Sequence, residues 1–135
     1  MGESLYCIYE QNLHVFKFDV LKSGTDILRE HVAEYKRNCR QFSATNYRSE
    51  QIIIIGGQRS IKASKTVLSL RPRDKKFSFY TKLPKLNKSR HSHAACELDG
   101  KLYVFGGLTK LGKFKESVER IDLAANETEW KIFSP

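Results

Sequence analysis

Two glycine pairs stand 50 residues apart in this chain, and each ends a run of apolar residues. Residues 52–57 read Ile-Ile-Ile-Ile-Gly-Gly, and residues 102–107 read Leu-Tyr-Val-Phe-Gly-Gly. A period near 50 residues is typical of repeat architectures, in which each repeat is one supersecondary unit that buries its faces against its neighbours. We therefore expect consecutive copies of one unit, and a function that stacked repeats can carry.

The residues around the glycine pairs repeat as well. Arg40 and Ala44 correspond to Arg90 and Ala94 at the same shift of 50. One residue of extra spacing then aligns four further pairs, which are Val67 with Val118, Leu70 with Ile121, Phe79 with Trp130, and Pro84 with Pro135. Two units are therefore expected, over residues 34–84 and 85–135.

The second unit, residues 85–135, reads as four short strands. Small or apolar residues alternate with polar ones over 89–98, which indicates a first strand. Asp99-Gly100 predicts a two-residue hairpin turn, because both positions adopt positive φ at low cost. The apolar run 102–105 then forms the second strand, and residues 117–123 and 129–133 form the third and fourth. Four antiparallel strands in about 50 residues suit one blade of a β-propeller.

The glycine pairs that follow the second strands have a physical meaning of their own. Glycine at a strand end indicates either a backbone angle that other residues avoid or the close approach of a neighbouring layer, which a Cβ atom would block. Gly56 and Gly57 mark the first complete unit, and Gly106 and Gly107 mark the second.

The unit over residues 34–84 follows the same plan with weaker markers. Its strands are expected over 40–44, 52–55, 66–70 and 77–80, with Phe79 in the position that Trp130 fills later. Residues 1–33 look like a truncated unit, with strands over 5–8 and 15–20. The stretch that contains Ile27 and Tyr35 is open to two interpretations, a strand in the repeat register or an amphipathic helix after Thr25. The repeat register favours the strand.

These motifs resemble kelch repeats. The resemblance rests on the spacing from Arg90 through Gly100 and Gly106-Gly107 to Trp130, and it covers about 100 residues well. It implies an all-β fold of consecutive four-stranded antiparallel blades of a kelch-type β-propeller, here an incomplete ring of about two and a half repeats. Kelch propellers act mostly as protein-binding modules, and many recognise substrates for ubiquitin ligases. The unit at 34–84 departs from the pattern because it lacks the tryptophan.

Composition restricts the class of protein further. The chain has 135 residues, a formal net charge of +9 and three cysteines at wide spacing, which does not suit a disulfide framework. The first residues lack the features of a signal peptide, and no apolar run approaches the roughly 20 residues that span a bilayer. We therefore expect a cytoplasmic protein without a membrane partner.

No residue pattern predicts catalysis, a cofactor or a metal site. His91, His93 and Cys96 form a local cluster, but a strand would direct Cys96 to the opposite face, and structural zinc needs four convergent ligands. Neither a Gly-x-Ser-x-Gly elbow nor a phosphate-binding loop is present. We therefore expect a binding module and not an enzyme.

Binding is expected in the loops that follow the glycine pairs, over residues 58–65 and 108–116. Loops on a rigid scaffold commonly carry binding residues. Six basic residues lie in these loops: Arg59, Lys62, Lys65, Lys110, Lys113 and Lys115. The preferred partner is a protein with an acidic surface, and the alternative is a nucleic acid or another polyanion held by the same basic loops.

The number of repeats raises a further question. A blade buries both faces of its sheet against neighbours, and two and a half units do not close a ring. Three explanations are open: a piece of a longer protein, a truncated gene product, or a chain that completes its ring by self-association. The first two are favoured. If the chain is alone, the run of isoleucines at 52–55 is an aggregation hazard, and the isolated protein should be poorly soluble or oligomeric.

Overall fold

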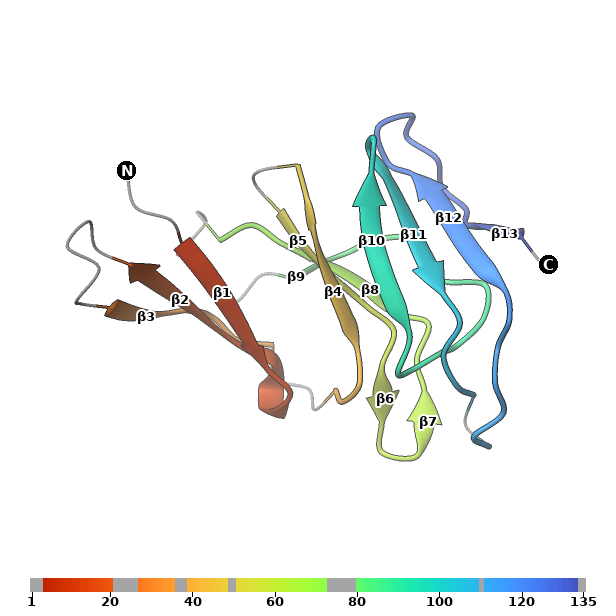
Figure 1. The fold of residues 1–135 in the computed structure, drawn as a ribbon, viewed down its shortest axis with the longest axis horizontal. Helices are drawn as coiled ribbons and strands as arrows, with labels where there is room; N and C mark the ends of the chain where they lie inside the picture. Colours follow the sequence, from red (N-terminus) through yellow and green to blue (C-terminus); the bar gives the residue numbers. More distant parts are fainter. Residues whose placement is uncertain are drawn as a thin grey trace.

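The protein folds as three antiparallel sheets side by side, shown in Figure 1. The structure is a computed structural model that describes residues 4–20, 27–35, 39–48, 51–72, 80–109 and 111–133. The only helical segment in these ranges is the 3-10 turn η1, Gln11–Leu13. No helix in the described part of the chain is long and apolar enough to cross a membrane.

The first sheet has three strands in the order β1-β2-β3, namely Ser4–Tyr9, His14–Val20 and Ile27–Ala33. The two strands expected over 5–8 and 15–20 are confirmed as β1 and β2. The stretch from Ile27 forms β3, antiparallel to β2, so the strand interpretation is correct and the helix interpretation is wrong. Pairing of β3 with β2, from Ile27 opposite Val20 to Ala33 opposite Val15, satisfies backbone hydrogen bonds of both strands.

The second sheet has the order β4-β5-β8-β9, namely Ser43–Tyr47, Gln51–Ile55, Val67–Leu70 and Tyr80–Lys82. The expected second and third strands are confirmed. The first strand begins three residues later than predicted from 40–44, because Gln41 takes a left-handed φ of 52° and interrupts the extended backbone. Of the predicted fourth strand, residues 77–79 lie outside the described residues.

The third sheet repeats this order as β10-β11-β12-β13, namely Ala94–Leu98, Lys101–Phe105, Val118–Asp122 and Lys131–Phe133. The predicted hairpin turn is confirmed, with φ of 50° at Asp99 and 78° at Gly100. The first strand again starts late: the prediction of a strand from residue 89 is wrong for 89–93, because Ser92 has a φ of 53°.

A short hairpin replaces the loop predicted at 58–65. It consists of β6, Gln58–Arg59, and β7, Lys62–Ala63, which pair antiparallel. Backbone hydrogen bonds between Arg40 and Gln58 in both directions, at 3.0 and 2.7 Å, fix its base. In Figure 1 this hairpin and the loop between β11 and β12 extend from the same, lower edge of the sheets.

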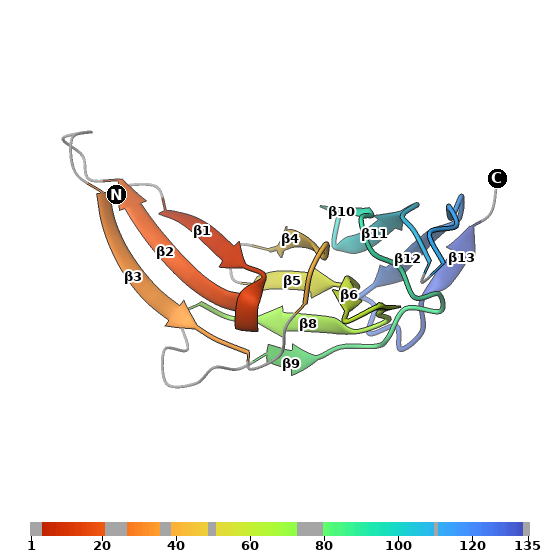
Figure 2. The same ribbon diagram turned by 90° about the horizontal axis from the view of Figure 1, so that it is seen from below.

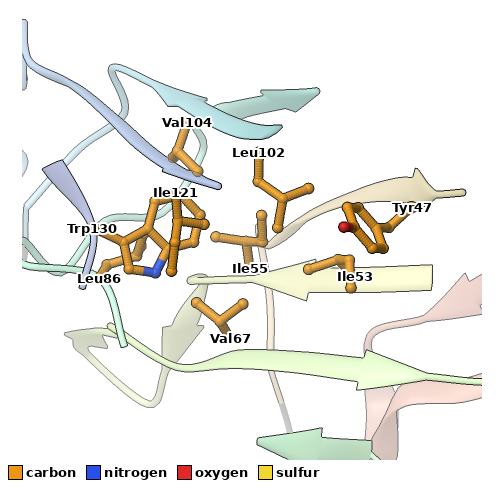
Figure 3. Close-up of a cluster of buried hydrophobic side chains, with 9 residues drawn as sticks. All are labelled: Tyr47, Ile53, Ile55, Val67, Leu86, Leu102, Val104, Ile121 and Trp130. Atoms are coloured by element: carbon orange, nitrogen blue, oxygen red, sulfur yellow. The ribbon is translucent and has the colours of Figure 1, made fainter. Parts of the chain in front are cut away.

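The side chains of β5 alternate between two cores. Ile52 and Ile54 pack with Leu68 and Leu70 against the first sheet, and Ile8 and Val15 are among the side chains that meet them there. A second cluster fills the space between the second and third sheets, as Figure 3 shows; its buried members are Tyr47, Ile53, Ile55, Val67, Leu86, Leu102, Val104, Ile121 and Trp130. The middle sheet is therefore covered on both faces, and this places its isoleucine run away from solvent.

The sheets follow an arc that does not close. In Figure 2, β4 and β10 lie on the upper side of the arc and β9 on the lower side. β4 and β10 are neighbours in space, and the amide N–H of Ser92 donates a hydrogen bond of 2.8 Å to the carbonyl of Gln41 between them. The all-β, incomplete propeller that was predicted is confirmed in this arrangement.

Candidate interaction surface

The glycine pairs bring neighbouring units into contact. Gly56 and Gly57 have φ of 64° and 97°, and Gly106 and Gly107 have φ of 62° and 92°. The N–H of Gly57 donates a hydrogen bond of 2.9 Å to the carbonyl of Arg90 in the next unit. A Cβ atom at Gly56 would lie 2.6 Å from that carbonyl oxygen. Both expectations for these glycines, positive φ and close approach, describe the first pair.

Beyond the first glycine pair, the chain forms one wall of an open groove of about 940 Å³. We call this the basic groove. Five of its lining residues carry positive charge and none is acidic; the lining comprises Arg40, Gln58, Arg59, Ser60, Lys62, Ala63, Ser64, Lys65, Thr66 and Lys85. None of its five cationic side chains forms an ion pair with a carboxylate of the described residues.

Backbone hydrogen bonds hold the walls of the basic groove in place. The N–H of Ser64 donates to the carbonyl of Gly57 at 2.7 Å, and the N–H of Arg90 donates to the carbonyl of Ser64 at 3.1 Å. The N–H of Leu86 donates to the carbonyl of Lys65 at 2.9 Å. Charged side chains therefore project from a backbone that the sheets have already fixed.

Positive charge continues beyond the basic groove to Lys115. Burial, followed by the positive charges of Lys88, Arg90 and Lys65, lowers the pKa of the Lys115 ammonium from its usual value. The Glu119 carboxylate opposes this shift, whereas the nearby cations reinforce the effect of burial.

The structure distributes the six predicted loop residues unevenly. Arg59, Lys62 and Lys65 line the basic groove, whereas Lys113 is exposed and does not line it. Lys115 is half-buried near Lys65, and Lys110 lies outside the described residues.

Sequence reasoning missed Arg40 and Lys85 as groove residues. The repeat pattern identifies Arg40 only as the counterpart of Arg90, and no motif singles out Lys85. Their approach to the hairpin depends on the bridge between Arg40 and Gln58 and on the return of the chain after β9. A signal existed in the local excess of basic residues, but it did not indicate which of them share one surface.

Arg90 is buried, although several lysines precede it closely in the sequence. Its guanidinium lies 2.7 Å from the Glu119 carboxylate, and both side chains are 0 % exposed. The same guanidinium donates to the carbonyls of Gly106 and Ser117 at 2.8 and 2.9 Å. The second oxygen of Glu119 accepts from the N–H of Asn87 at 2.6 Å. This network joins three segments of the last unit, residues 87–90, Gly106 and residues 117–119, and is structural.

Trp130 is buried against the start of its own unit. Its Nε1–H donates a hydrogen bond of 2.8 Å to the carbonyl of Pro84, and its carbonyl accepts from the Asn87 side chain at 2.6 Å. Trp130 thus links the outer strand to the connection that leads into the unit. Its predicted counterpart, Phe79, lies outside the described residues.

His93, Cys96 and Cys39 have different surroundings. His93 forms a hydrogen bond of 2.7 Å between Nε2 and the Ser43 hydroxyl, and burial beside Arg90 lowers the pKa of the imidazole to about 4. Cys96 is exposed on β10, and Cys39 is buried, where burial raises the pKa of the thiol to about 11. Within the described residues, no group of three histidine, cysteine or acidic side chains could hold a metal ion.

Comparisons with known proteins agree with this architecture. A family model described as the kelch motif matches residues 89–131. No curated protein matches the chain in sequence. The chain is similar to the solved structure of YjhT, a kelch-type propeller, with a TM-score of 0.76 at 13% identity; the match covers 99% of this chain and 48% of YjhT. The chain thus spans about half the length of that structure. Residues 89–131 are therefore a kelch repeat, and the chain has the fold of a partial kelch-type β-propeller.

Proposed function

We propose that this chain is a protein-interaction module that binds an acidic segment of a partner protein in the basic groove. The observation that carries this proposal is the set of five cations in one open groove, without a described carboxylate to pair with them. An acidic peptide would supply the missing counter-charges. Arg40 and Arg59 can each hold a carboxylate with two parallel hydrogen bonds, whereas the lysines act as point charges.

A protein partner suits the groove better than single-stranded nucleic acid does. Proteins that bind single strands combine cations with aromatic side chains on which the bases stack. None of the residues that line the basic groove is aromatic. Duplex DNA would find phosphate-neutralising charges here, but its binding would weaken steeply with salt and show little sequence preference.

A fluorescent peptide of ten glutamates provides a direct test. We expect the chain to bind this peptide at low salt, as measured by fluorescence anisotropy. Lys62→Glu should weaken binding by about fivefold, because an exposed ion pair contributes up to about 1 kcal/mol and the new carboxylate repels the peptide. Lys82→Glu is the matched control, since Lys82 is also an exposed strand lysine but does not line the groove.

Two outcomes would contradict the proposal. One is equal weakening by Lys62→Glu and Lys82→Glu, since this would show a response to net charge alone. The other is binding of a single-stranded or duplex oligonucleotide of equal charge under conditions in which the glutamate peptide does not bind. That result would favour the polyanion alternative.

A further inference from the structure

The two outer faces of the arc carry exposed apolar side chains. On the first sheet, Leu5 is 61 % exposed, and Cys7 is exposed beside it. On the last sheet, Phe105, Phe133 and Leu98 are 42, 48 and 59 % exposed. We call these surfaces the leading face and the trailing face. Strand pairing places Cys7 opposite Phe16 on the leading face, and Cys96 opposite Tyr103 on the trailing face.

Equivalent positions in the three sheets indicate which kind of surface would pack against each of these faces. In the middle sheet, Ile52 and Ile54 pack toward the preceding sheet. Their equivalents in the last sheet, Leu102 and Val104, pack toward the middle sheet in the same sense. The equivalents in the first sheet are Leu5 and Cys7, which have no preceding sheet to cover them.

The same register holds on the other side of each sheet. Ile53 and Ile55 of the middle sheet pack toward the following sheet. Their equivalents in the last sheet are Tyr103 and Phe105, whose rings stack with centroids 6.3 Å apart. The apolar side chains of the trailing face therefore repeat, one unit later, those that the second sheet buries against the third. Arg120, opposite Tyr103, is a charged residue on the same face and lies over the Phe133 ring. The apolar side chains of the leading face correspond to those on the receiving side of such a contact.

The arc corresponds to about half of the solved structure that it resembles. The structural match to YjhT covers 99% of this chain and 48% of YjhT, with a TM-score of 0.76. Two such arcs with the same curvature amount to almost one complete propeller. A twofold axis through the centre of the ring would bring the trailing face of each copy onto the leading face of the other. Such head-to-tail contacts form a closed assembly when the rotation closes.

We propose that the partner of these two faces is a second copy of this chain, and that two copies join head to tail into one closed propeller. This arrangement covers both apolar faces with surfaces that already pack together inside the chain. A face-to-face pairing of two trailing faces would instead join two surfaces of the same kind, which the chain does not do anywhere in its described interior. The proposal stands independently of the basic groove.

Sedimentation and chemical cross-linking test this assembly on the full 135-residue chain. Sedimentation equilibrium should give a particle of two copies. A short bismaleimide should then link Cys7 of one copy to Cys96 of the other, because sheets that pack face to face lie about 10 Å apart. Cys39 is buried and should not react. Mass spectrometry of the linked peptides identifies which cysteines are joined.

A pair of matched variants separates the trailing face from general surface hydrophobicity. Phe105→Asp places a charge inside both proposed contacts and should weaken dimerisation by about a hundredfold or more. Phe114→Asp removes an equally large side chain that is 86 % exposed in the loop before β12, and it should leave dimerisation unchanged. Trp130 fluorescence reports whether each variant keeps its last sheet folded, since Trp130 is the only tryptophan.

Four results would overturn the proposal. The first is a folded monomer at high concentration, and the second is an open-ended series of oligomers. The third is a dimer that lacks the link between Cys7 and Cys96 or that links Cys96 to Cys96. The fourth is an equal effect of the two aspartate variants on dimerisation. A monomer or an open-ended series would mean that other blades, such as those of a longer polypeptide, cover these faces.

Discussion

The second and third sheets share one plan but are held together by different interactions. In the third sheet, the buried Arg90 guanidinium pairs with Glu119 and bonds to the backbone on both sides. In the second sheet, the equivalent Arg40 is exposed, and Leu68 is buried at the position of Glu119. The backbone order of the four strands is nevertheless the same. The buried aliphatic side chains of the strands are therefore sufficient to form the blade, and the polar network stabilises it further.

This difference also explains where the family match falls. The match covers 89–131 and leaves out the preceding unit. The segment that matches contains Arg90, Glu119 and Trp130, whereas the second sheet retains the glycine pair and the apolar strands. Polar and aromatic markers make a repeat recognisable in sequence, while buried aliphatic side chains are sufficient to preserve its fold.

The largest expected effect comes from breaking the ion pair on one side. Arg90→Met should lower the free energy of unfolding by about 3–5 kcal/mol, because Glu119 would remain buried without its partner. Arg40→Met, at the exposed equivalent position, should change it by less than about 0.5 kcal/mol. Urea unfolding followed by circular dichroism gives both values. Similar losses for the two variants would contradict the distinction between the sheets.

A double variant sharpens the same comparison. Arg90→Met with Glu119→Leu copies the apolar solution of the second sheet and should recover about half of the loss, because no uncompensated charge remains. The recovery is incomplete because the N–H groups of Asn87 and Lys88 lose their acceptor. A double variant no more stable than Arg90→Met would show that the third sheet depends on the network.

The glycine pairs give the next largest effect. Gly56→Ala should lower the free energy of unfolding by about 3 kcal/mol. Two costs add in this value: alanine disfavours the left-handed backbone, and its Cβ atom would lie 2.6 Å from the carbonyl oxygen of Arg90. Gly106→Ala has the same backbone cost of about 1–2 kcal/mol, but its nearest contact is at 3.4 Å. The difference arises because the third sheet covers Gly56. Chemical denaturation of both variants measures it, and equal costs would count against the contact.

The smallest effect is a pH dependence from His93. Its folded pKa of about 4 lies below the ordinary value of 6.5, so the unfolded chain binds a proton first as the pH falls. The free energy of unfolding should therefore fall by about 2 kcal/mol between pH 6.5 and pH 4, with no contribution at pH 7 or above. His93→Gln should show a shallower decline, and parallel curves for the two proteins would exclude His93 as the source.

Much of the fold was predictable because it depends on local signals. The apolar run 102–105, the Asp99-Gly100 turn and the glycine pair after each second strand are signals carried by a few neighbouring residues. The starts of β4 and β10 were misplaced because the positive φ of Gln41 and Ser92 leaves no mark in residue type. Tertiary contacts set those angles.

The candidate site was only partly predictable for a related reason. Arg59, Lys62 and Lys65 follow one glycine pair and were found together. Arg40 and Lys85 reach the same groove from other segments, so their position depends on how the sheets stack. The pairing of Arg90 with Glu119 likewise joins residues 29 positions apart in the sequence, and a basic residue in a basic stretch gives no indication that it is buried.

The isoleucine strand β5 affects how cooperatively the three sheets unfold. Ile52 and Ile54 belong to one core, and Ile53 and Ile55 belong to the other. If either neighbouring sheet dissociates, one of these two pairs of side chains becomes exposed to water. Removal of the first sheet would expose Ile52 and Ile54 while Ile53 and Ile55 stayed dry. The strand therefore couples the two ends of the arc, and melting should spread through β5 from one end to the other.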